Sequence, residues 1–262
     1  MTAPLVVLTG ASSGLGQALA LHYHRAGWRL ALIVRQPAKL QAWLGEQGLA
    51  GCDRVALYAA DVRHPEAVMA AGRACLAAQG LPDVVIANAG ISHGVDLAEA
   101  GDIAVMQAIL DTNVTGLAAT FQPFIGPMRE ARRGTLVGIA SVAGIRGLPG
   151  HAAYTASKAA VIQVCESLRV ELKPAGVRVV TLLPGYVDTP MTRGNPFPMP
   201  FLISADTFAE RAARAIAAGV SFRVIPWQMG VAGKLLRLLP DALWDRVMAR
   251  AGRKPRASAG EL

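Results

Sequence analysis

Cysteine is scarce in this sequence, and its spacing excludes the structures that cysteine usually supports. The three cysteines, Cys52, Cys75 and Cys165, are odd in number and far apart, and no C-x-x-C motif occurs. This pattern argues against a disulfide framework and a cysteine zinc site, and it is typical of reduced thiols. We therefore assign no metal site and predict a cytoplasmic protein.

Long hydrophobic runs and aromatic residues are also missing. No apolar run reaches the ~18 residues of a membrane span, and a strand pattern starts within a few residues of the N-terminus, so we expect no secretory signal. Aromatic residues make up 5% of the chain and no nucleic-acid-binding motif occurs, so the formal net charge of +8 does not indicate a nucleic-acid partner. An anionic cofactor or an anionic membrane surface would also suit this charge.

Short apolar runs alternate with longer helical patterns along most of the chain. The predicted strands cover residues 5–10, 28–34, 54–60, 82–90, 134–141, 177–185 and 222–226. The predicted helices cover residues 14–27, 38–48, 65–80, 102–128, the segment around 154–164, and 206–219. Near-continuous apolar strands with helices between them indicate a doubly wound α/β fold: a parallel sheet between two helical layers, with ligands at the carboxyl ends of the strands.

The length of 262 residues and the hydrophobic content of 53% suit one large core. We predict a single domain over residues 1–230, which includes a proline-rich loop at 184–203. A helical, basic C-terminal extension at 231–262 is expected to pack on the same domain. The last 30 residues contain seven Lys or Arg against three Asp or Glu. We expect two short amphipathic helices broken at Pro240, and a frayed tail at 252–262.

A glycine-rich turn follows the first predicted strand. The segment T-G-A-S-S-G-L-G has glycines at positions 10, 14 and 16 and opens a helix. Glycines let a backbone approach a pyrophosphate, and the N–H groups at the helix start hold the anion. The alternative is a tight turn that binds no ligand.

Tyr154 and Lys158 are four residues apart, so on a helix they point the same way. Reducing a ketone requires a hydride on carbon and a proton on oxygen, and a tyrosine with a pKa of about 10 is a poor base near neutrality. A positive charge ~5 Å away is worth about 3 kcal/mol at an effective dielectric of ~20, which lowers the pKa by roughly two units. The pair thus suits a general acid and base, although two amphipathic side chains at a core edge would give the same pattern.

Five motifs in chain order resemble the short-chain dehydrogenase/reductase family. They are T-G-x-x-x-G-x-G at 9–16, N-A-G at 88–90, Asn113, Ser141 and Y-x-x-x-K at 154–158. The segment P-G-Y-V-D-T-P at 184–190 resembles the loop that members place over the nicotinamide, and the match covers roughly residues 4–192. The resemblance implies a Rossmann-type fold and nicotinamide-dependent hydride transfer at a carbonyl or alcohol.

The resemblance also implies roles for individual residues. Tyr154 is the general acid and base, Ser141 hydrogen-bonds the substrate oxygen, Lys158 holds the nicotinamide ribose, and Asn113 supports a water leading to Lys158. The implied catalytic set is Asn113, Ser141, Tyr154 and Lys158. The implied cofactor-binding set is Gly10, Ser12, Ser13, Gly14, Leu15, Gly16, Asp61, Val62, Asn88, Ala89, Gly90, Tyr154, Lys158, Pro184, Gly185, Val187 and Thr189.

The end of the second strand bears on the choice of cofactor. Relatives that prefer NAD usually carry an acid there, whereas this chain has Val34 followed by Arg35. A guanidinium suits a 2′-phosphate because its planar donors bind phosphate in pairs, and Ser13 can add a hydroxyl. We therefore favour NADP(H) and add Arg35 to the cofactor-binding set, although a solvated surface arginine is the alternative. Asp61 is expected to face the adenine, or else to cap a helix.

The substrate is expected near the loop at 184–203. Tyr186 would border it, and an apolar wall would be formed by Met191, Phe197, Met199 and Phe201. His93 and His151 lie near the expected pocket mouth, where each either orients substrate or is a plain loop histidine.

The leading interpretation is an NADP(H)-dependent oxidoreductase that acts on a carbonyl or secondary alcohol of a moderately apolar small molecule. A catalytically idle NADP-binding sensor and a carrier-linked ketoacyl reductase are the alternatives.

The extension does not resemble the C-terminal segment that many members use in tetramers, so we favour a homodimer. Apolar residues recur in it at near-helical spacing, namely Leu235, Leu236, Leu238, Leu239, Leu243, Trp244 and Val247. Such a stripe is expected to pack on the protein's own core or pocket rim. Weak contact with a membrane surface is the alternative, because basic residues lie between the apolar ones.

Overall fold

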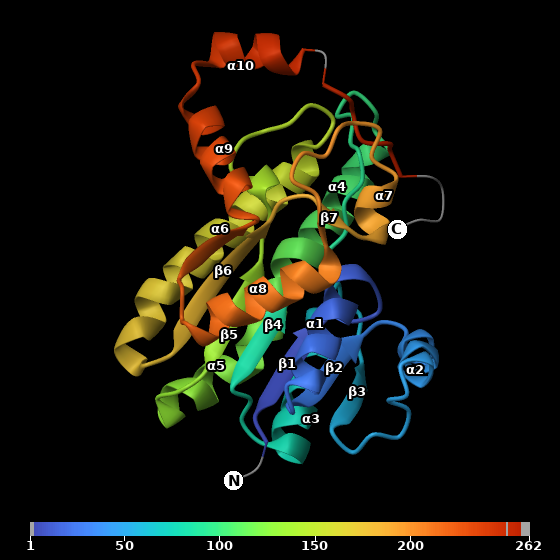
Figure 1. The fold of residues 1–262 in the computed structure, drawn as a ribbon, viewed down its shortest axis with the longest axis vertical. Coiled ribbons are helices and arrows are strands. Elements are labelled where there is room, and N and C mark those ends of the chain that lie inside the picture. The colour runs from blue at the N-terminus through green and yellow to red at the C-terminus, as the bar shows by residue number, and fades with distance from the viewer. Residues whose placement is uncertain (1–2, 250, 258–262) are drawn as a thin grey trace.

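The computed structural model describes residues 3–249 and 251–257 (Figure 1). Its main sheet has seven strands in the order β3-β2-β1-β4-β5-β6-β9, and all neighbours pair in parallel. The strands are β1 Leu5–Thr9, β2 Arg29–Val34, β3 Val55–Ala59, β4 Val84–Ala87, β5 Thr135–Ile139, β6 Arg178–Pro184 and β9 Phe222–Ile225. The predicted doubly wound parallel sheet is confirmed.

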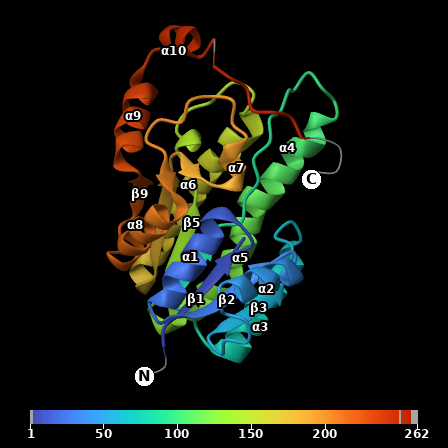
Figure 2. The ribbon, with the colours of Figure 1, turned by 45° about the vertical axis from the view of Figure 1, so that its right-hand side comes forward.

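Helices cover both faces of this sheet, which gives three layers (Figures 1 and 2). One core contains side chains of α1 Gly14–Arg25, α2 Pro37–Glu46 and α8 Ala205–Ala217. The other contains side chains of α3 Pro65–Gln79, α5 Gly116–Ala131 and α6 Ala152–Leu172. Successive strand residues point to opposite faces, so β1 sends Val6 and Leu8 into the first core and Leu5 and Val7 into the second. Burial on both faces explains why the strands read as continuous apolar runs.

The strand order reverses between β1 and β4. From β1 the chain proceeds to β2 and β3 on one side, whereas from β4 it proceeds to β5, β6 and β9 on the other side. The connections therefore leave the sheet in opposite directions at this point, and a crevice forms outside the carboxyl ends of the two strands. The glycine turn and the N-A-G motif follow these two strands.

The helix predicted at 102–128 is interrupted. It consists of α4 Asp102–Leu110, a π-helical turn Asp111–Thr115, and α5. The hydroxyl of Thr112 donates to the carbonyl of Ala108 at 2.8 Å within this stretch. Single π turns are frequent at functional sites because they re-aim a side chain, and this turn carries Asn113.

The loop at 184–203 contains short elements that the proline pattern does not predict. They are the strand β7 Val187–Asp188, the helix α7 Pro190–Arg193 and the strand β8 Ile203–Ser204, which pairs in parallel with β7. The side chain of Thr192 accounts for the short helix, because it closes a capping box with Thr189 and donates to the carbonyl of Val187 at 2.6 Å.

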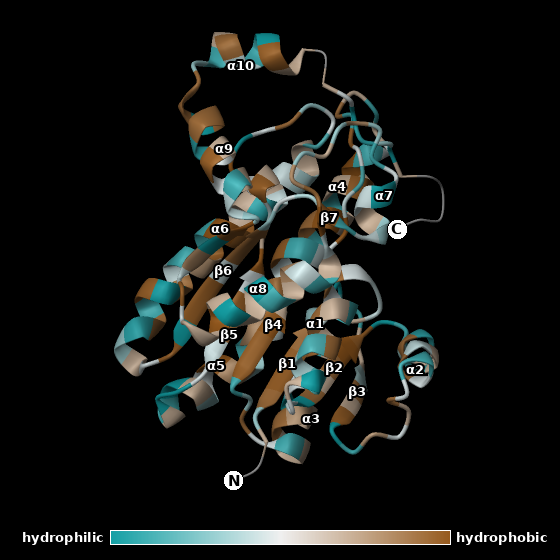
Figure 3. Ribbon diagram, in the orientation of Figure 1, coloured by the Kyte–Doolittle hydropathy of each residue, from teal (hydrophilic) through white to brown (hydrophobic). Residues whose placement is uncertain are grey.

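Two helices follow the sheet, and α9 begins four residues before the predicted start of the extension. α9 is Trp227–Leu238 and α10 is Asp241–Met248, separated at Pro240 as expected. Five of the seven residues of the apolar stripe are exposed, namely Leu235 at 62%, Leu236 at 36%, Leu238 at 80%, Leu243 at 45% and Val247 at 54%. Figure 3 shows brown and teal alternating on both helices. None of the described helices is long and apolar enough to cross a membrane.

The prediction of a frayed tail is wrong for residues 252–257. This segment returns over the body past α4 and α7 (Figure 2), and Arg256 forms an isolated β-bridge with Gly94. The guanidinium of Arg256 donates two hydrogen bonds of 2.8 Å to the carboxylate of Asp102, which holds the segment in place. Residues 258–262 of the predicted tail lie outside the described residues.

Candidate active site

The turn between β1 and α1 is shaped by the absence of side chains at its glycines. Gly10 has a φ of +70°, and a Cβ there would lie 2.7 Å from the Cα of Ala89. A Cβ on Gly16 would lie 2.1 Å from the carbonyl oxygen of Gly10. Ser13 is the N-cap of α1 but makes no side-chain capping hydrogen bond. The turn thus presents N–H groups and the positive end of a helix, a donor set that fits a pyrophosphate.

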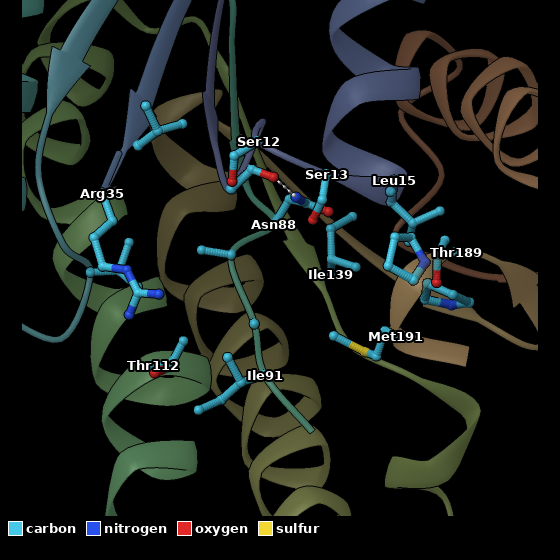
Figure 4. A pocket seen from close by; sticks show the side chains of 18 of the residues that line it. Ser12, Ser13, Leu15, Arg35, Asn88, Ile91, Thr112, Ile139, Thr189 and Met191 are labelled. Carbon is cyan, nitrogen blue, oxygen red and sulfur yellow. Dashed lines mark hydrogen bonds between the residues drawn. The ribbon is translucent and has the colours of Figure 1, made fainter. Parts of the chain in front are cut away.

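A cavity of about 410 Å³ opens beside this turn at the carboxyl ends of the strands. Every residue of the predicted cofactor-binding set lines it except Gly16, which shapes the turn from behind. Figure 4 shows Arg35 at one end, Ser12 and Ser13 in the middle, and Thr189 and Met191 at the other end. Sequence reasoning missed further lining residues, among them Lys39, Arg63, Ile91, Thr112 and Ile139. We call this space the cofactor cavity.

Asn88 connects the ends of β1 and β4 at the crevice through hydrogen bonds. Its side-chain amide donates to the carbonyls of Thr9 at 3.0 Å and Gly10 at 3.2 Å. In return, the Thr9 hydroxyl accepts from the backbone N–H groups of Asn88 and Ala89 at 3.1 and 3.2 Å. The N-A-G motif therefore fixes the position of the glycine turn.

The four predicted catalytic residues come together from three parts of the chain. Ser141 follows β5, Tyr154 and Lys158 lie on α6, and Asn113 lies on the π-helical turn. The Nζ of Lys158 lies 5.8 Å from the centre of the Tyr154 ring, and it donates to the carbonyl of Ile139 at 2.9 Å. A Cβ on Gly90 would lie 3.2 Å from the Oδ1 of Asn113 and 3.4 Å from the Nζ of Lys158. These two side chains therefore flank Gly90.

Asn113 links α6 to the loop after β4. Its Oδ1 accepts from the backbone N–H of Ile91 at 2.9 Å, and its Nδ2 donates to the carbonyl of Ile91 at 3.1 Å. The same Nδ2 donates to the Ser157 hydroxyl at 2.9 Å, which in turn donates to the carbonyl of Tyr154 at 2.7 Å. This network positions the helix turn that carries Tyr154 and Lys158.

Comparison with known proteins agrees with this geometry. Residues 4–196 match the sequence profile of the short chain dehydrogenases. An uncharacterized oxidoreductase of Myxococcus xanthus is 42% identical over 244 residues, which is 93% of this chain and 96% of that protein.

Two solved structures are also similar. The 3-ketoacyl-(acyl-carrier-protein) reductase of Brucella melitensis, complexed with NADH, has a TM-score of 0.74 and 29% identity over 84% of this chain and 94% of that one. A short chain dehydrogenase/reductase of Burkholderia phymatum in complex with NAD has a TM-score of 0.79 and 24% identity over 98% of both chains, which shows a shared fold.

The chain belongs to the short-chain dehydrogenase/reductase family.

Membership of the short-chain dehydrogenase/reductase family defines the reaction class. The protein is an NAD(P)-dependent oxidoreductase that acts on a CH–OH group or the corresponding carbonyl. The cofactor cavity and the cluster around Tyr154 lie at the carboxyl ends of the strands, where ligands bind in open α/β sheets.

In this short-chain dehydrogenase/reductase, burial dominates the ionisation of the Tyr154–Lys158 pair. Burial raises the pKa of Tyr154, and a hydrogen bond with Ser141 opposes that rise. Burial also lowers the pKa of Lys158 to about 8. The expected fall in the pKa of Tyr154 is therefore wrong for the protein without cofactor, because removal of the phenol from water raises its pKa and Ser141 only partly opposes this.

The end of the cofactor cavity near β2 and β3 is rich in positive charge. Arg35, Lys39 and Arg63 line it, and Asp61 is the one acid in the described lining. The Arg63 guanidinium donates to Oδ2 of Asp61 at 2.9 and 3.2 Å and to Oδ1 at 3.3 Å, whereas Arg35 lies 3.8 Å from Asp61 and its side chain is 57% exposed. Burial raises the pKa of Asp61, but Arg63 and Arg35 together hold it below its usual value. The alternative that Asp61 caps α3 is wrong, since His64 is the N-cap.

A second cavity, of about 430 Å³, lies on the other side of Tyr154. We call it the substrate cavity. Of the residues expected to border the substrate, Tyr186, Met191, Phe197 and His151 line it, whereas Met199, Phe201 and His93 do not. Leu236 and Trp244 of the apolar stripe also line it, in keeping with the expected packing on the core or pocket rim, whereas sequence reasoning missed Met229, Met248 and Lys254.

Arg146 ties the two C-terminal helices to the body. Its guanidinium donates to the backbone carbonyls of Leu236 and Leu239 at the end of α9, and to the Asp241 carboxylate at 2.9 Å. It also lies 4.6 Å from the centre of the Trp244 ring on α10. One side chain thus satisfies the carbonyls at a helix end and fixes the bend at Pro240.

Proposed function

We propose that the protein is an NADP(H)-dependent oxidoreductase that transfers a hydride between the nicotinamide and a carbonyl or secondary alcohol of a moderately apolar small molecule. One observation carries the proposal: Ser141 and Tyr154 line both the cofactor cavity and the substrate cavity. A reacting carbon held against their hydroxyls would lie between a cofactor and an apolar pocket.

Tyr154 is the proposed general acid and base. In the reductive direction the bound cofactor supplies the hydride to the carbonyl carbon. The Tyr154 hydroxyl gives its proton to the carbonyl oxygen, and the tyrosine is reprotonated from solvent. Burial raises the pKa of the phenol, so Tyr154 carries its proton before the step, and the hydrogen bond with Ser141 opposes that rise. The Ser141 hydroxyl hydrogen-bonds the oxygen as its charge changes.

Lys158 and Asn113 are proposed to support Tyr154. Lys158 lines the cofactor cavity and would hold the nicotinamide ribose. Asn113 fixes the turn of α6 that carries both residues. It would also support a water that leads to Lys158.

The preference for NADP(H) rests on the charge near β2. Three cations line that end of the cavity. The single acid there is hydrogen-bonded to Arg63 and pairs with Arg35 only at 3.8 Å, so the exposed Arg35 and Lys39 would meet a 2′-phosphate. A guanidinium matches phosphate geometry better than it matches neutral ribose hydroxyls. Asp61 is proposed to face the adenine.

A carbonyl panel tests this function. Purified protein is mixed with NADPH or NADH and with aldehydes, ketones and oxo acids of increasing apolar size, and loss of nicotinamide absorbance is followed. We expect turnover with apolar carbonyls and a preference for NADPH of about ten-fold or more, equivalent to ~1.4 kcal/mol. NADPH binding without turnover of any carbonyl or alcohol would instead favour the idle sensor.

We also propose that the protein is cytoplasmic and that it forms a homodimer. Weak contact with a membrane surface is the alternative role for the extension, because apolar residues of α9 and α10 are exposed.

A further inference from the structure

The C-terminal segment 251–257, which we call the strap, closes one side of the substrate cavity. Gly252 and Lys254 line this cavity together with Ser141 and Tyr154. The backbone N–H of Gly94 donates to the carbonyl of Pro255 at 2.8 Å. A Cβ on Gly94 would lie 2.1 Å from the carbonyl oxygen of Lys254, so the strap is packed directly against the main-chain of the body.

The strap is also held by charge at its far end. The guanidinium of Arg256 donates two hydrogen bonds to the carboxylate of Asp102, a residue that is buried and only 4% exposed. The backbone N–H of Asp96 donates to the same carboxylate at 2.8 Å, which fixes Asp102 in turn. The position of Lys254 between these contacts is therefore defined by the fold.

Among the described residues, Lys254 is a cation with no acidic partner. Its Nζ donates to the carbonyl of Met191 at 3.3 Å, and none of the salt bridges found among the described residues includes it. No Asp or Glu appears in the described lining of the substrate cavity. The other cation of that lining, Arg146, is paired with Asp241 at 2.9 Å. One uncompensated positive charge therefore faces a mostly apolar cavity.

The surroundings of Lys254 offer it little stabilisation. It is half-buried, and burial lowers its pKa. The neighbouring His151 is buried, and its pKa is lowered, first by burial and further by the charge of Lys254, although the carbonyl of Pro149 opposes this. The lowered pKa of His151 disfavours its cationic form, so Lys254 is the cation that remains beside it. A desolvated ammonium gains most from an anion that reaches it inside the cavity.

We propose that the substrate carries a carboxylate, or a similar single negative charge, at a distance from its reacting carbonyl, and that Lys254 binds this group while Ser141 and Tyr154 hold the carbonyl oxygen. This inference rests on the proposed function, because it names the class of substrate for the same site. A single ammonium matches a monoanion, and the apolar wall between the two ends matches a hydrocarbon spacer. The substrate class is thus an oxo acid with an apolar spacer.

Matched pairs of acids and esters test the inference. The probes are levulinate and para-acetylbenzoate, each with its methyl ester, so that the spacer changes between the pairs and the charge is removed within each pair. We expect the wild type to reduce at least one acid with a kcat/KM about ten-fold above its ester. Lys254→Met should remove that advantage, mainly through KM, while the ester changes by less than about two-fold.

Two variants serve as controls. Lys254→Arg keeps the charge and should retain most of the advantage of the acid. Arg253→Gln removes a charge from the adjacent strap position, where the side chain is 71% exposed and outside the cavity lining, and should leave both kcat/KM values within about two-fold. The NADPH Kd and the thermal stability of each variant report whether the fold is kept.

The possible results distinguish a failure of this inference from a failure of the proposed function. Equal losses for acid and ester in Lys254→Met, or a wild type that prefers every ester over its acid, would overturn the role of Lys254 while leaving the oxidoreductase assignment intact. If the wild type turns over none of these acids and esters but reduces other carbonyls of the panel, this inference fails and the proposed function stands. If it reduces no carbonyl at all while NADPH still binds, the proposed function fails and the inference falls with it.

Discussion

The two cavities that meet at Tyr154 are nearly equal in volume, about 410 and 430 Å³, but they are built in different ways. The cofactor cavity is lined by turns that directly follow strands, and its shape depends on glycines whose backbones touch. The substrate cavity is lined by Ser92 and by residues within 141–154, 185–198 and 229–254, which approach one another only through long-range packing. The first can therefore be identified from short motifs, whereas the second depends on how distant segments fold together.

Two glycine substitutions should damage the two cavities selectively, and the larger effect is expected at the glycine turn. In Gly16→Ala the new methyl group would lie 2.1 Å from the carbonyl oxygen of Gly10, so the turn must open. We expect NADPH to bind about 100-fold more weakly, which corresponds to ~3 kcal/mol. Fluorescence titration with NADPH measures this effect. Gly126→Ala is the control because nothing lies within 4 Å of its added Cβ. Equal NADPH affinity in Gly16→Ala and wild type would contradict the geometry of the turn.

Gly94→Ala is the matching change at the substrate cavity. Its methyl group would displace the strap at the carbonyl of Lys254. We expect substrate KM to rise about ten-fold while the NADPH Kd stays within about two-fold, because the cofactor cavity shares no lining with the strap. Steady-state kinetics and NADPH titration on the same preparation separate the two values. A loss of NADPH affinity comparable to that of Gly16→Ala would mean that the two cavities are not independent.

The lining of the cofactor cavity could be predicted in detail from the sequence because its residues belong to short local motifs. The order T-G-x-x-x-G-x-G, N-A-G and Y-x-x-x-K fixes turns and helix faces within a few residues, so nearly every predicted cofactor residue lines the cavity. Lys39 and Arg63 were missed, although Arg63 follows Asp61 by two residues and could have been read as its partner. The π-helical turn that carries Asn113 has no sequence pattern of its own.

The lining of the substrate cavity was predicted less completely because it depends on contacts between residues that are far apart in the sequence. Arg146 and Trp244 are nearly 100 residues apart, and their contact decides where α10 lies. The strap is held by Arg256 and Asp102, which no periodic pattern connects. Because no sequence pattern reveals this contact, the segment was predicted to be a frayed tail.

A smaller effect is expected at the adenosine end of the cofactor cavity. Arg35→Ala should reduce the preference for NADPH over NADH by about ten-fold, since one guanidinium contact with a phosphate is worth roughly 1–2 kcal/mol. The ratio of kcat/KM for the two cofactors measures this. Arg25→Ala, at the far end of α1, is a suitable control. An unchanged ratio in Arg35→Ala would assign the 2′-phosphate to Lys39 or Arg63 instead.

The smallest predicted effect concerns the pH dependence of stability in the protein without cofactor. The pKa of Lys158 is lowered from 10.5 to about 8, so above pH 8 the unfolded chain binds more protons than the folded one at this residue. Lys158 therefore makes stability rise with pH, by about 1 kcal/mol between pH 7 and pH 9. Buried Cys75 and Cys165, with raised pKa values of about 11, oppose this near pH 9.

The measurement that isolates Lys158 compares urea unfolding of wild type and Lys158→Met at both pH values, because Cys75 cancels in the difference and Cys165 cancels except for its electrostatic coupling to Lys158. The wild type should gain about 1 kcal/mol relative to the variant on going to the higher pH. The same pH dependence in both proteins would show that Lys158 keeps its proton in the folded state.

The central claim is that Tyr154 performs proton transfer where the two cavities meet. The most direct test measures NADPH affinity and turnover in Tyr154→Phe, with Tyr186→Phe as a control that removes another phenol from the substrate cavity. We predict that Tyr154→Phe binds NADPH within about two-fold of wild type and loses at least about 100-fold in kcat on a carbonyl that wild type reduces. A Tyr154→Phe protein that keeps more than about a tenth of the wild-type kcat would contradict the account.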